Sequence, residues 1–407
     1  MEIQFLGGAS HVGSLGMLLR RGPLTLLFDY GMLPSKPPEF PAEAPPVDAL
    51  LLSHAHLDHS GMTPWLTARY DVEVFATPPT LEVTDLLLED SLRVADSEGY
   101  RIPYNKGDVK GATKFFRPIE FNDSIDFGGV EIFTHSAGHI PGATMYEVNV
   151  EKNILFSGDL HTQSTDLVLG AKSVKCDILV LESTYAGRQH PPRENVEKEF
   201  LHKIREVNDN DGLAIVPAFA VGRTQDVLLT LAKKRFYTWL DGMGKSVNSI
   251  YLNYPGYVRS VRKLKDAMSK TKVVGGKRRF ESALRGEVIV TTSGMLDGGP
   301  VLRYIERLRD DPHSAILLTG YQVEGTNGRR LVDEGVIDLY GVDIKPKCEL
   351  VQFDFSAHAG HNDLVKFVEG CDPEKVILMH GDNRQELAKD LEGVECIMPQ
   401  EGQWIEL

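Results

Sequence analysis

Short apolar runs that end in polar or turn residues dominate the first 185 residues of the chain. Each run is four to six residues long, the length of a buried β-strand, and several end at residues able to carry chemistry. The pattern therefore predicts a strand-rich first part, with polar side chains just past the carboxyl ends of strands. The predicted strands are Leu24–Asp29, Ala49–Ser53, Val72–Ala76, Val130–Thr134, Ile154–Ser157 and Ile178–Glu182.

The middle of the chain alternates between strand-like and helix-like patterns. Apolar runs precede segments of helical periodicity such as 223–235, and Pro300 stands where a helix would begin. This alternation is typical of a mostly parallel sheet with helices on its faces. The predicted strands here are Leu213–Pro217, Ser249–Asn253, Glu287–Thr291 and Ala315–Thr319.

The last part of the chain again shows short apolar runs that end in polar residues, as the first part does. Cys348–Asp354 and Lys375–His380 are predicted strands followed closely or ended by a histidine. The simplest account is a middle domain inserted into the first domain. We predict a first segment at 1–184, an inserted domain at 185–340, and a segment at 341–407 that completes the first domain and its site.

Composition narrows the class of protein. The chain has 407 residues, 42% of them hydrophobic and 25% charged, which is typical of a globular protein. No run approaches the roughly 20 apolar residues needed to cross a bilayer, and no signal peptide is expected. The four cysteines are too scattered for a disulfide framework. We therefore expect a cytoplasmic protein with no membrane partner.

The charge of the chain is unevenly distributed. The net charge of −14 argues against a general nucleic-acid binder, but one segment opposes this balance. Residues 259–279 form either a solvated helix face or a local positive field that collects nucleic acid. Their cations, against one aspartate, are Arg259, Arg262, Lys263, Lys265, Lys270, Lys272, Lys277, Arg278 and Arg279.

The strongest local signal is a run of potential metal ligands at 54–59. His54, His56, Asp58 and His59 directly follow an apolar run, where a loop lets them converge. His54 and His56 share one side of an extended turn, while Asp58 and His59 can face a second point. Imidazole and carboxylate ligands suit zinc, and also manganese or iron.

Further ligands are expected at the ends of other strands. His139 lies among small residues in His-Ser-Ala-Gly-His-Ile-Pro-Gly, Asp159 ends Phe-Ser-Gly-Asp, and His380 follows Leu-Met. A carboxylate at 159 could bridge two metals. Each residue alone could be an ordinary polar strand end, but their common placement favours a metal site.

These motifs resemble a known superfamily. His-Ala-His-Leu-Asp-His-Ser-Gly at 54–61 is similar to the HxHxDH signature of metallo-β-lactamase-fold hydrolases, and Asp29, His139 and Asp159 match its other motifs in order. The resemblance implies an αββα sandwich. It also implies one metal on His54, His56 and His139, a second on Asp58, His59 and His380, Asp159 as the bridge, and Asp29 orienting a ligand histidine.

The resemblance narrows to the β-CASP nucleases and covers essentially the whole chain. Glu182-Ser-Thr-Tyr, Phe355-Ser-Ala-His358-Ala and His380-Gly-Asp look like the three extra motifs of that family. Segments 217–223, 292–300 and 320–329 are similar to its inserted α/β domain. Ser-Ala-His resembles the branch of the cleavage and polyadenylation specificity factor nuclease, and the chain most resembles its short archaeal type without KH domains. Gly360, Asp382 and Ser10-His11 depart from the family pattern without removing a ligand.

The resemblance implies a ribonuclease with two Zn²⁺ ions, active in RNA processing or decay. The metals would activate a water for in-line attack on phosphorus, leaving 5′-phosphate and 3′-hydroxyl products. His358 is the candidate acid for the leaving oxygen, Glu182 its partner, and Asp58 is counted with them as catalytic. Single-stranded RNA is the expected partner, with a homodimer and RNA-processing complexes as further expectations. The candidate RNA contacts are Arg223, Thr292, Ser293, Gly294, Thr326 and Arg329.

Several alternatives stay open at this point. A small-molecule hydrolase uses the same metal core but needs neither the insertion nor the Glu182–His358 pair. A non-catalytic scaffold subunit would usually have lost metal ligands, and none is missing here. A DNA nuclease would share the same centre. For an RNA-cleaving enzyme, the same site residues would serve an endonuclease or a 5′→3′ exonuclease, so the sequence does not distinguish these two activities.

Overall fold

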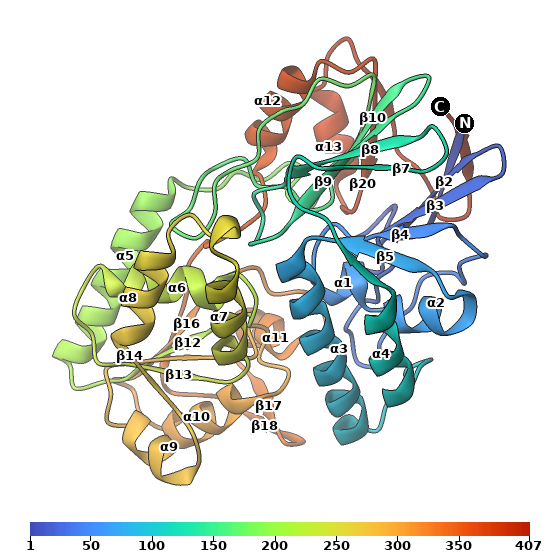
Figure 1. Ribbon diagram of the computed structural model, residues 1–407. Helices are drawn as coiled ribbons and strands as arrows, with labels where there is room; N and C mark the ends of the chain where they lie inside the picture. Colours follow the sequence, from blue (N-terminus) through green and yellow to red (C-terminus); the bar gives the residue numbers. More distant parts are fainter. The chain divides into compact units, whose positions relative to one another are not determined.

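A computed structural model describes residues 1–407 and divides into two compact units. Unit 1 consists of residues 1–164, 169–189 and 358–407, and unit 2 of residues 165–168 and 190–357. Both are mixed α/β units (Figure 1). None of the helices combines the length and the apolar composition that a membrane crossing requires.

Unit 1 contains two sheets of seven strands each. The first sheet has the order β22-β1-β2-β3-β4-β5-β6 and consists of β1 (Glu2–Gly7), β2 (Gly16–Arg21), β3 (Leu24–Phe28), β4 (Ala49–Leu51), β5 (Glu73–Ala76), β6 (Phe116–Pro118) and β22 (Trp404–Glu406). The second has the order β21-β20-β11-β10-β9-β8-β7 and consists of β7 (Ser124–Asp126), β8 (Glu131–Ser136), β9 (Thr144–Asn149), β10 (Asn153–Phe156), β11 (Ile178–Glu182), β20 (Lys375–Met379) and β21 (Glu395–Ile397).

The two sheets of unit 1 pack face to face through one apolar core. Phe5, Phe28 and Met17 from the first sheet share this core with Tyr146 and Phe156 from the second. Helices cover the outer faces, so unit 1 is the four-layer αββα sandwich that the family resemblance implied (Figure 1). The helices are α1 (Leu57–Ser60), α2 (Thr63–Tyr70), α3 (Pro78–Glu98), α4 (Lys106–Ala112), the 3₁₀ turn Thr113–Phe115, α12 (His361–Cys371) and α13 (Arg384–Lys389).

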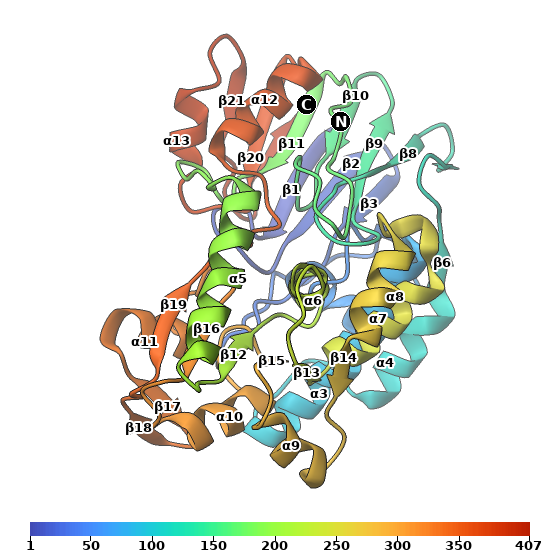
Figure 2. The same cartoon turned by 90° about the vertical axis from the view of Figure 1, so that its left-hand side faces the viewer.

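Unit 2 is built on a six-stranded parallel sheet of order β14-β13-β15-β12-β16-β19, visible side by side in Figure 2. Its strands are β12 (Ala214–Pro217), β13 (Thr238–Asp241), β14 (Thr271–Val273), β15 (Val288–Thr291), β16 (Ala315–Leu318) and β19 (Glu349–Gln352), beside a hairpin of β17 (Ile337–Leu339) and β18 (Val342–Ile344). The helices are α5 (Arg193–Asp209), α6 (Arg223–Ala232), α7 (Gly244–Asn253), the 3₁₀ turn Pro255–Tyr257, α8 (Val261–Ser269), α9 (Lys277–Ala283), α10 (Pro300–Leu308) and α11 (Asn327–Glu334).

In unit 2, the structure differs from the prediction at Ser249–Asn253 and at the boundary predicted at residue 341. Ser249–Asn253, predicted as a strand, is the last part of α7, and the strand of this region is β13, which is buried along its whole length. β19 pairs in parallel with β16, which keeps residues 341–357 in unit 2. The chain returns to unit 1 at His358 rather than at 341.

The core between the two sheets should dominate the stability of unit 1. The Phe156 ring is fully buried, with its centroid 5.3 Å from that of Phe28. We expect Phe156→Ala to lower the free energy of unfolding by about 3–5 kcal/mol, because the cavity cannot be refilled. Leu169→Ala, at a side chain that is 61% exposed, should change it by less than about 0.5 kcal/mol. Urea unfolding measures both, and equal losses would contradict the assignment of this core.

Candidate metal centre, catalytic pair and RNA-binding loops

The ligand-rich segment begins where β4 ends. The chain runs through a series of bends to His56 and then forms the single turn α1, so Asp58 and His59 lie on a helical turn rather than in the loop predicted from sequence. Backbone hydrogen bonds hold this turn: Leu15 N–H donates to the Asp58 carbonyl (2.8 Å) and Tyr30 N–H to the His59 carbonyl (2.7 Å). The turn is therefore fixed by the segments that precede β2 and follow β3.

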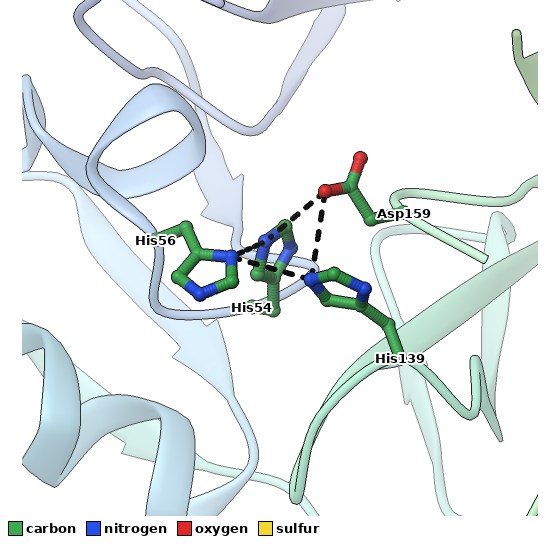
Figure 3. A group of neighbouring side chains, drawn as sticks. All are labelled: His54, His56, His139 and Asp159. Atoms are coloured by element: carbon green, nitrogen blue, oxygen red, sulfur yellow. Dashed lines mark hydrogen bonds and ion pairs between the residues drawn. The ribbon is translucent and has the colours of Figure 1, made fainter. Parts of the chain in front are cut away.

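His54, His56, His139 and Asp159 form a first group of converging side chains (Figure 3). Their ligand atoms lie within 4.8 Å of one another. Nδ1 of His56 lies 3.0 Å from Nε2 of His54 and 3.2 Å from Nε2 of His139. Oδ2 of Asp159 lies 3.5 Å from Nε2 of His54. Three imidazole nitrogens and one carboxylate oxygen thus face a common point, a donor set that suits zinc.

Asp58, His59 and His380 form a second group, whose ligand atoms also lie within 4.8 Å of one another. Oδ2 of Asp58 lies 3.9 Å from Nε2 of His59 and 3.8 Å from Nε2 of His380. Oδ1 of Asp159 lies 3.3 Å from Nε2 of His59 and 3.3 Å from Nδ1 of His380. The two oxygens of Asp159 therefore face different groups.

The residues present fit a bound metal. Nε2 of His59, Oδ1 of Asp159 and Nδ1 of His380 are buried and form no hydrogen bond. An unpaired polar atom inside a protein costs about 1–3 kcal/mol. Atoms left unpaired on facing side chains are expected where a cation completes the site. Here Oδ1 of Asp159 lies 3.3 Å from each of the two nitrogen atoms, which belong to the second group.

Asp29 holds one of the converging histidines in place. Its Oδ2 lies 2.8 Å from Nδ1 of His59, and it accepts hydrogen bonds from the Ser53 N–H (2.6 Å) and hydroxyl (2.7 Å). Nδ1–H of His59 then donates to Asp29, which leaves the lone pair of Nε2 directed at the centre. Such a carboxylate fixes the tautomer and raises the basicity of a ligand histidine.

The protonation of the centre follows from burial and neighbouring charge. Burial favours the neutral form of Asp159, but His59, His358 and His380 outweigh it and hold the pKa of Asp159 well below its usual range. Burial also lowers the pKa of His54, helped by the charge of His59. A carboxylate that stays ionised beside a neutral imidazole is the state in which both can bind a cation.

The buried Glu182 and the half-buried His358 form a pair beside the first group. Nδ1 of His358 lies 3.0 Å from Oε1 of Glu182, and Nε2 lies 3.8 Å from Oδ2 of Asp159. Glu182 also accepts backbone hydrogen bonds from Leu160 and Thr184, so its carboxylate cannot turn away. Burial opposes the charge on His358, but Glu182 and then Asp159 outweigh it and raise the pKa of His358 to about 9.

His361 supports this pair and was missed in the sequence. Its Nδ1 accepts a hydrogen bond from the Gly187 N–H (2.9 Å), its Nε2 lies 2.7 Å from Oδ2 of Asp390, and its N–H donates to the Arg188 carbonyl. These bonds tie the segment after Glu182 to the start of α12, directly after His358. The only signal in the sequence is a histidine three residues beyond His358.

The predicted RNA contacts lie at the carboxyl edge of the sheet in unit 2. Arg223 begins α6, and the segment 292–294 follows β15. The Gln322 amide donates to the Gly294 carbonyl (3.2 Å), and the Gly328 N–H donates to the Met295 carbonyl (2.8 Å). The loops after β15 and β16 are therefore packed together.

Two of the predicted RNA contacts have structural partners within α11. The hydroxyl of Thr326 caps this helix by accepting from the Arg329 N–H (3.2 Å), and Nε of Arg329 lies 2.7 Å from Oδ2 of Asp333. Two aromatic side chains escaped the sequence analysis: Phe219 in the loop after β12 and Tyr321 in the loop after β16. Phe219 is 37% exposed and Tyr321 is 39% exposed, a placement that periodicity cannot indicate.

Models of known protein families match successive segments along the chain. The model of the metallo-β-lactamase superfamily matches residues 11–216, that of the Beta-Casp domain residues 225–331, and that of a Zn-dependent metallo-hydrolase RNA specificity domain residues 343–399. A crystal structure of a protein of unknown function from Enterococcus faecalis V583 covers 100% of this chain and 99% of its own, with a TM-score of 0.67. At 16% identity, this likeness shows a common fold.

Curated relatives match over nearly the full length of the chain. The probable RNase MJ4 of Methanocaldococcus jannaschii is 37% identical over 95% of this chain and 94% of its own. RNase aCSPSF2 of Saccharolobus solfataricus is 34% identical over 100% of this chain and 85% of its own. Transcription termination factor FttA of Methanococcus maripaludis is 31% identical over 94% of this chain and 67% of its own.

The fold and the histidine-rich centre define a metallo-hydrolase. More narrowly, the chain belongs to the β-CASP family of metallo-β-lactamase-fold ribonucleases. It is a metal-dependent ribonuclease.

Gly31 tests how the backbone supports the centre. A Cβ at Gly31 would lie 1.7 Å from the carbonyl oxygen of Asp58, so Gly31→Ala must displace the α1 turn. We expect a lower metal content per chain, measured by elemental analysis of the purified protein. Gly111→Ala, where a Cβ meets nothing within 4 Å, should keep the wild-type content. Full metal content in Gly31→Ala would contradict a role of this turn.

His361→Phe tests the support of the catalytic pair. The variant keeps a ring but loses both side-chain hydrogen-bond partners, so we expect unfolding to become easier by about 1 kcal/mol. RNA cleavage should slow while metal content stays unchanged, because the ring touches no proposed ligand. Asp390→Asn, at a carboxylate that is 62% exposed, should have a smaller effect on both readouts. Unchanged cleavage by His361→Phe would assign the ring a purely local role.

Proposed function

We propose that the protein hydrolyses RNA phosphodiester bonds with two Zn²⁺ ions, leaving 5′-phosphate and 3′-hydroxyl ends, in RNA processing or decay. The observation that carries the proposal is the position of Asp159. One of its oxygens faces His54, His56 and His139, the other faces His59 and His380, and the Glu182–His358 pair adjoins it. A two-metal centre with a separate proton donor can activate a water and stabilise both the attacking and the leaving oxygen in phosphodiester hydrolysis.

Each residue then has a proposed role in holding the metals. His54, His56 and His139 would hold one Zn²⁺, and Asp58, His59 and His380 the other. Asp159 would bridge them, and Asp29 would keep His59 in its binding tautomer. When bound, the two cations supply an activated water and offset the charge of the phosphate.

His358 is proposed to donate the proton that the leaving 3′ oxygen needs. Glu182 keeps the ring charged and directs Nε2 toward the centre, since Nδ1–H is engaged by the carboxylate at 3.0 Å. A donor that is protonated at neutral pH and held in one orientation is suited to general acid catalysis. Glu182 is in this view a positioning residue, and Asp58 acts through the metal that it holds.

Unit 2 is proposed to bind the RNA strand through the loops after β12, β15 and β16. Thr292, Ser293 and Gly294 offer hydroxyl and backbone donors, and Arg223 offers charge. The exposed rings of Phe219 and Tyr321 suit stacking on single-stranded bases. Thr326 and Arg329 would contribute mainly by shaping this surface, because both are engaged within α11. A homodimer and partners in RNA processing are further parts of the proposal.

The experiment uses a single-stranded RNA labelled at its 5′ end and the zinc-loaded protein. We expect His358→Ala to lower the cleavage rate about 10²- to 10⁴-fold at unchanged metal content, because only the proton donor is removed. Internal labelled fragments would identify an endonuclease, and labelled mononucleotide alone a 5′→3′ exonuclease. A DNA strand of the same sequence, digested in the same way, shows whether the protein cleaves RNA or DNA.

His135→Ala is a matched control for this experiment. His135 also forms a histidine–glutamate pair, with Nε2 2.6 Å from Oε2 of Glu147, but it lies on β8 and belongs neither to the two groups of converging side chains nor to the Glu182–His358 pair. This variant should cleave at the wild-type rate. Wild-type cleavage by His358→Ala would remove this residue from the mechanism, and inactivity of the fully metal-loaded wild type on RNA would overturn the proposed function.

A further inference from the structure

The basic segment 259–279 does not form one charged face. It divides into α8, β14 and α9, and several of its cations have partners. Nζ of Lys263 lies 2.9 Å from Asp166, Nζ of Lys270 lies 2.6 Å from Asp266, and Nη1 of Arg279 donates to the Val273 carbonyl. Lys277 has no such partner, and the fold brings it beside cations from distant parts of the chain.

Lys277 lines a cavity of about 340 Å³ within unit 2. The cavity lies past the carboxyl ends of β13 and β14, and its lining includes residues of α7, α9 and α10. We call it the basic pocket; its lining includes Asp241, Lys245, Val274, Lys277, Phe280 and Arg303. Lys245, Lys277 and Arg303 thus converge from three different helices.

The charges of the pocket leave two cations uncompensated. Asp241 is satisfied, because it accepts hydrogen bonds from the Tyr304 hydroxyl (3.0 Å), the Gly242 N–H (2.8 Å) and Nζ of Lys245 (3.4 Å). The other carboxylate of the lining, Glu281, faces Arg307 at 3.5 Å. Lys277 and Arg303 form no ion pair, and the Arg303 guanidinium is held 4.3 Å over the Phe280 ring. A concave site with two free cations favours an anion.

The strand order places the basic pocket beside the proposed RNA loops. β13 pairs with β15 through Asp241 and Thr291, and β14 lies on the far side of β13. Gly242, just past β13, is in contact with Thr292: a Cβ there would lie 2.0 Å from its hydroxyl oxygen. With strands about 5 Å apart, the pocket begins on the order of 5–10 Å from the loop after β15. Ligands of parallel sheets commonly bind at this edge.

We propose that the basic pocket binds a phosphate of the RNA strand next to the part held by Thr292, Ser293 and Gly294. This inference rests on the proposed function, since it extends the RNA path along the carboxyl edge of the sheet from β15 to β14. Lys277 and Arg303 are the contacting cations, while Lys245 keeps Asp241 from repelling the phosphate. The pocket contributes affinity for longer strands and takes no part in bond cleavage.

The test measures RNA binding separately from cleavage. In the zinc-loaded His358→Ala background, with the RNA verified intact on a gel, we compare the Lys277→Ala/Arg303→Ala double variant with its parent over a range of salt concentrations. We expect affinity for a long single strand to fall about tenfold. The slope of log K against log salt should become shallower by about 0.7 for each phosphate that the variant no longer neutralises.

The matched control is Arg262→Ala/Lys265→Ala, which removes the same two charges from the exposed face of α8. It should change affinity less than twofold. Equal decreases in both double variants would mean diffuse electrostatic attraction and would overturn the pocket. Unchanged binding in the Lys277→Ala/Arg303→Ala variant would overturn it as well. Because both comparisons measure binding of intact RNA, failure of the nuclease assignment is detected separately in the cleavage assay.

Lysine acetylation followed by mass spectrometry provides a second readout in unmutated zinc-loaded protein. RNA should protect Lys277 from acetylation severalfold and leave Lys265 reactive. Titration with inorganic phosphate and adenosine monophosphate tests the other source of the same chemistry. Protection by these small anions without protection by RNA would assign the pocket to a free phosphate ligand and overturn the proposal.

Discussion

The centre depends on burying the carboxylate of Asp159 among histidines. Asp159 is only 3% exposed, and an isolated charge at such a position would cost several kcal/mol. Its neighbours offset that cost: Nε2 of His59 lies 3.3 Å from one oxygen and Nε2 of His54 lies 3.5 Å from the other. The same arrangement leaves ligand atoms without hydrogen bonds. Bound cations would give these ligand atoms the partners that they lack, and this links the stability of the centre to its function.

The need to hold Asp159 and its neighbouring histidines in place explains why most contacts that support the centre involve backbone groups. The α1 turn is held by the carbonyl groups of Asp58 and His59, and Glu182 is held by the N–H groups of Leu160 and Thr184. Side chains turn about several bonds, whereas the peptide groups of packed strands scarcely move. A ligand set must keep its geometry before the cation arrives, because reorganisation would reduce affinity. The two-sheet core of unit 1 supplies that rigidity.

In unit 2, packed strands also position the loops that follow them, but these loops do not share a ligand. Parallel strands end at one edge, so the loops after β12, β15 and β16 gather there without a shared ligand. Some polar groups at this edge are consumed by the fold, as in the capping of α11 by Thr326. Others, such as Lys277 and Arg303, have no counter-ion. Whether a polar residue at this edge stabilises the fold or is available to bind a ligand therefore depends on its interaction partners and not on its residue type.

The sequence by itself was sufficient to predict the class of fold, and it indicated the candidate ligands that the structure brings together. The run at 54–59 is dense, and the motifs at Asp159, Glu182 and His358 follow apolar runs or known spacings, so local pattern was sufficient. It could not place Ser249–Asn253, a short mixed run that α7 absorbs, nor the return of the chain at His358. Tertiary structure alone decided that His361 bonds to Gly187 and Asp390, that Arg329 is paired with Asp333, and that Lys277 and Arg303 line the same pocket. These outcomes depend on how segments pack in space, which no local periodicity encodes.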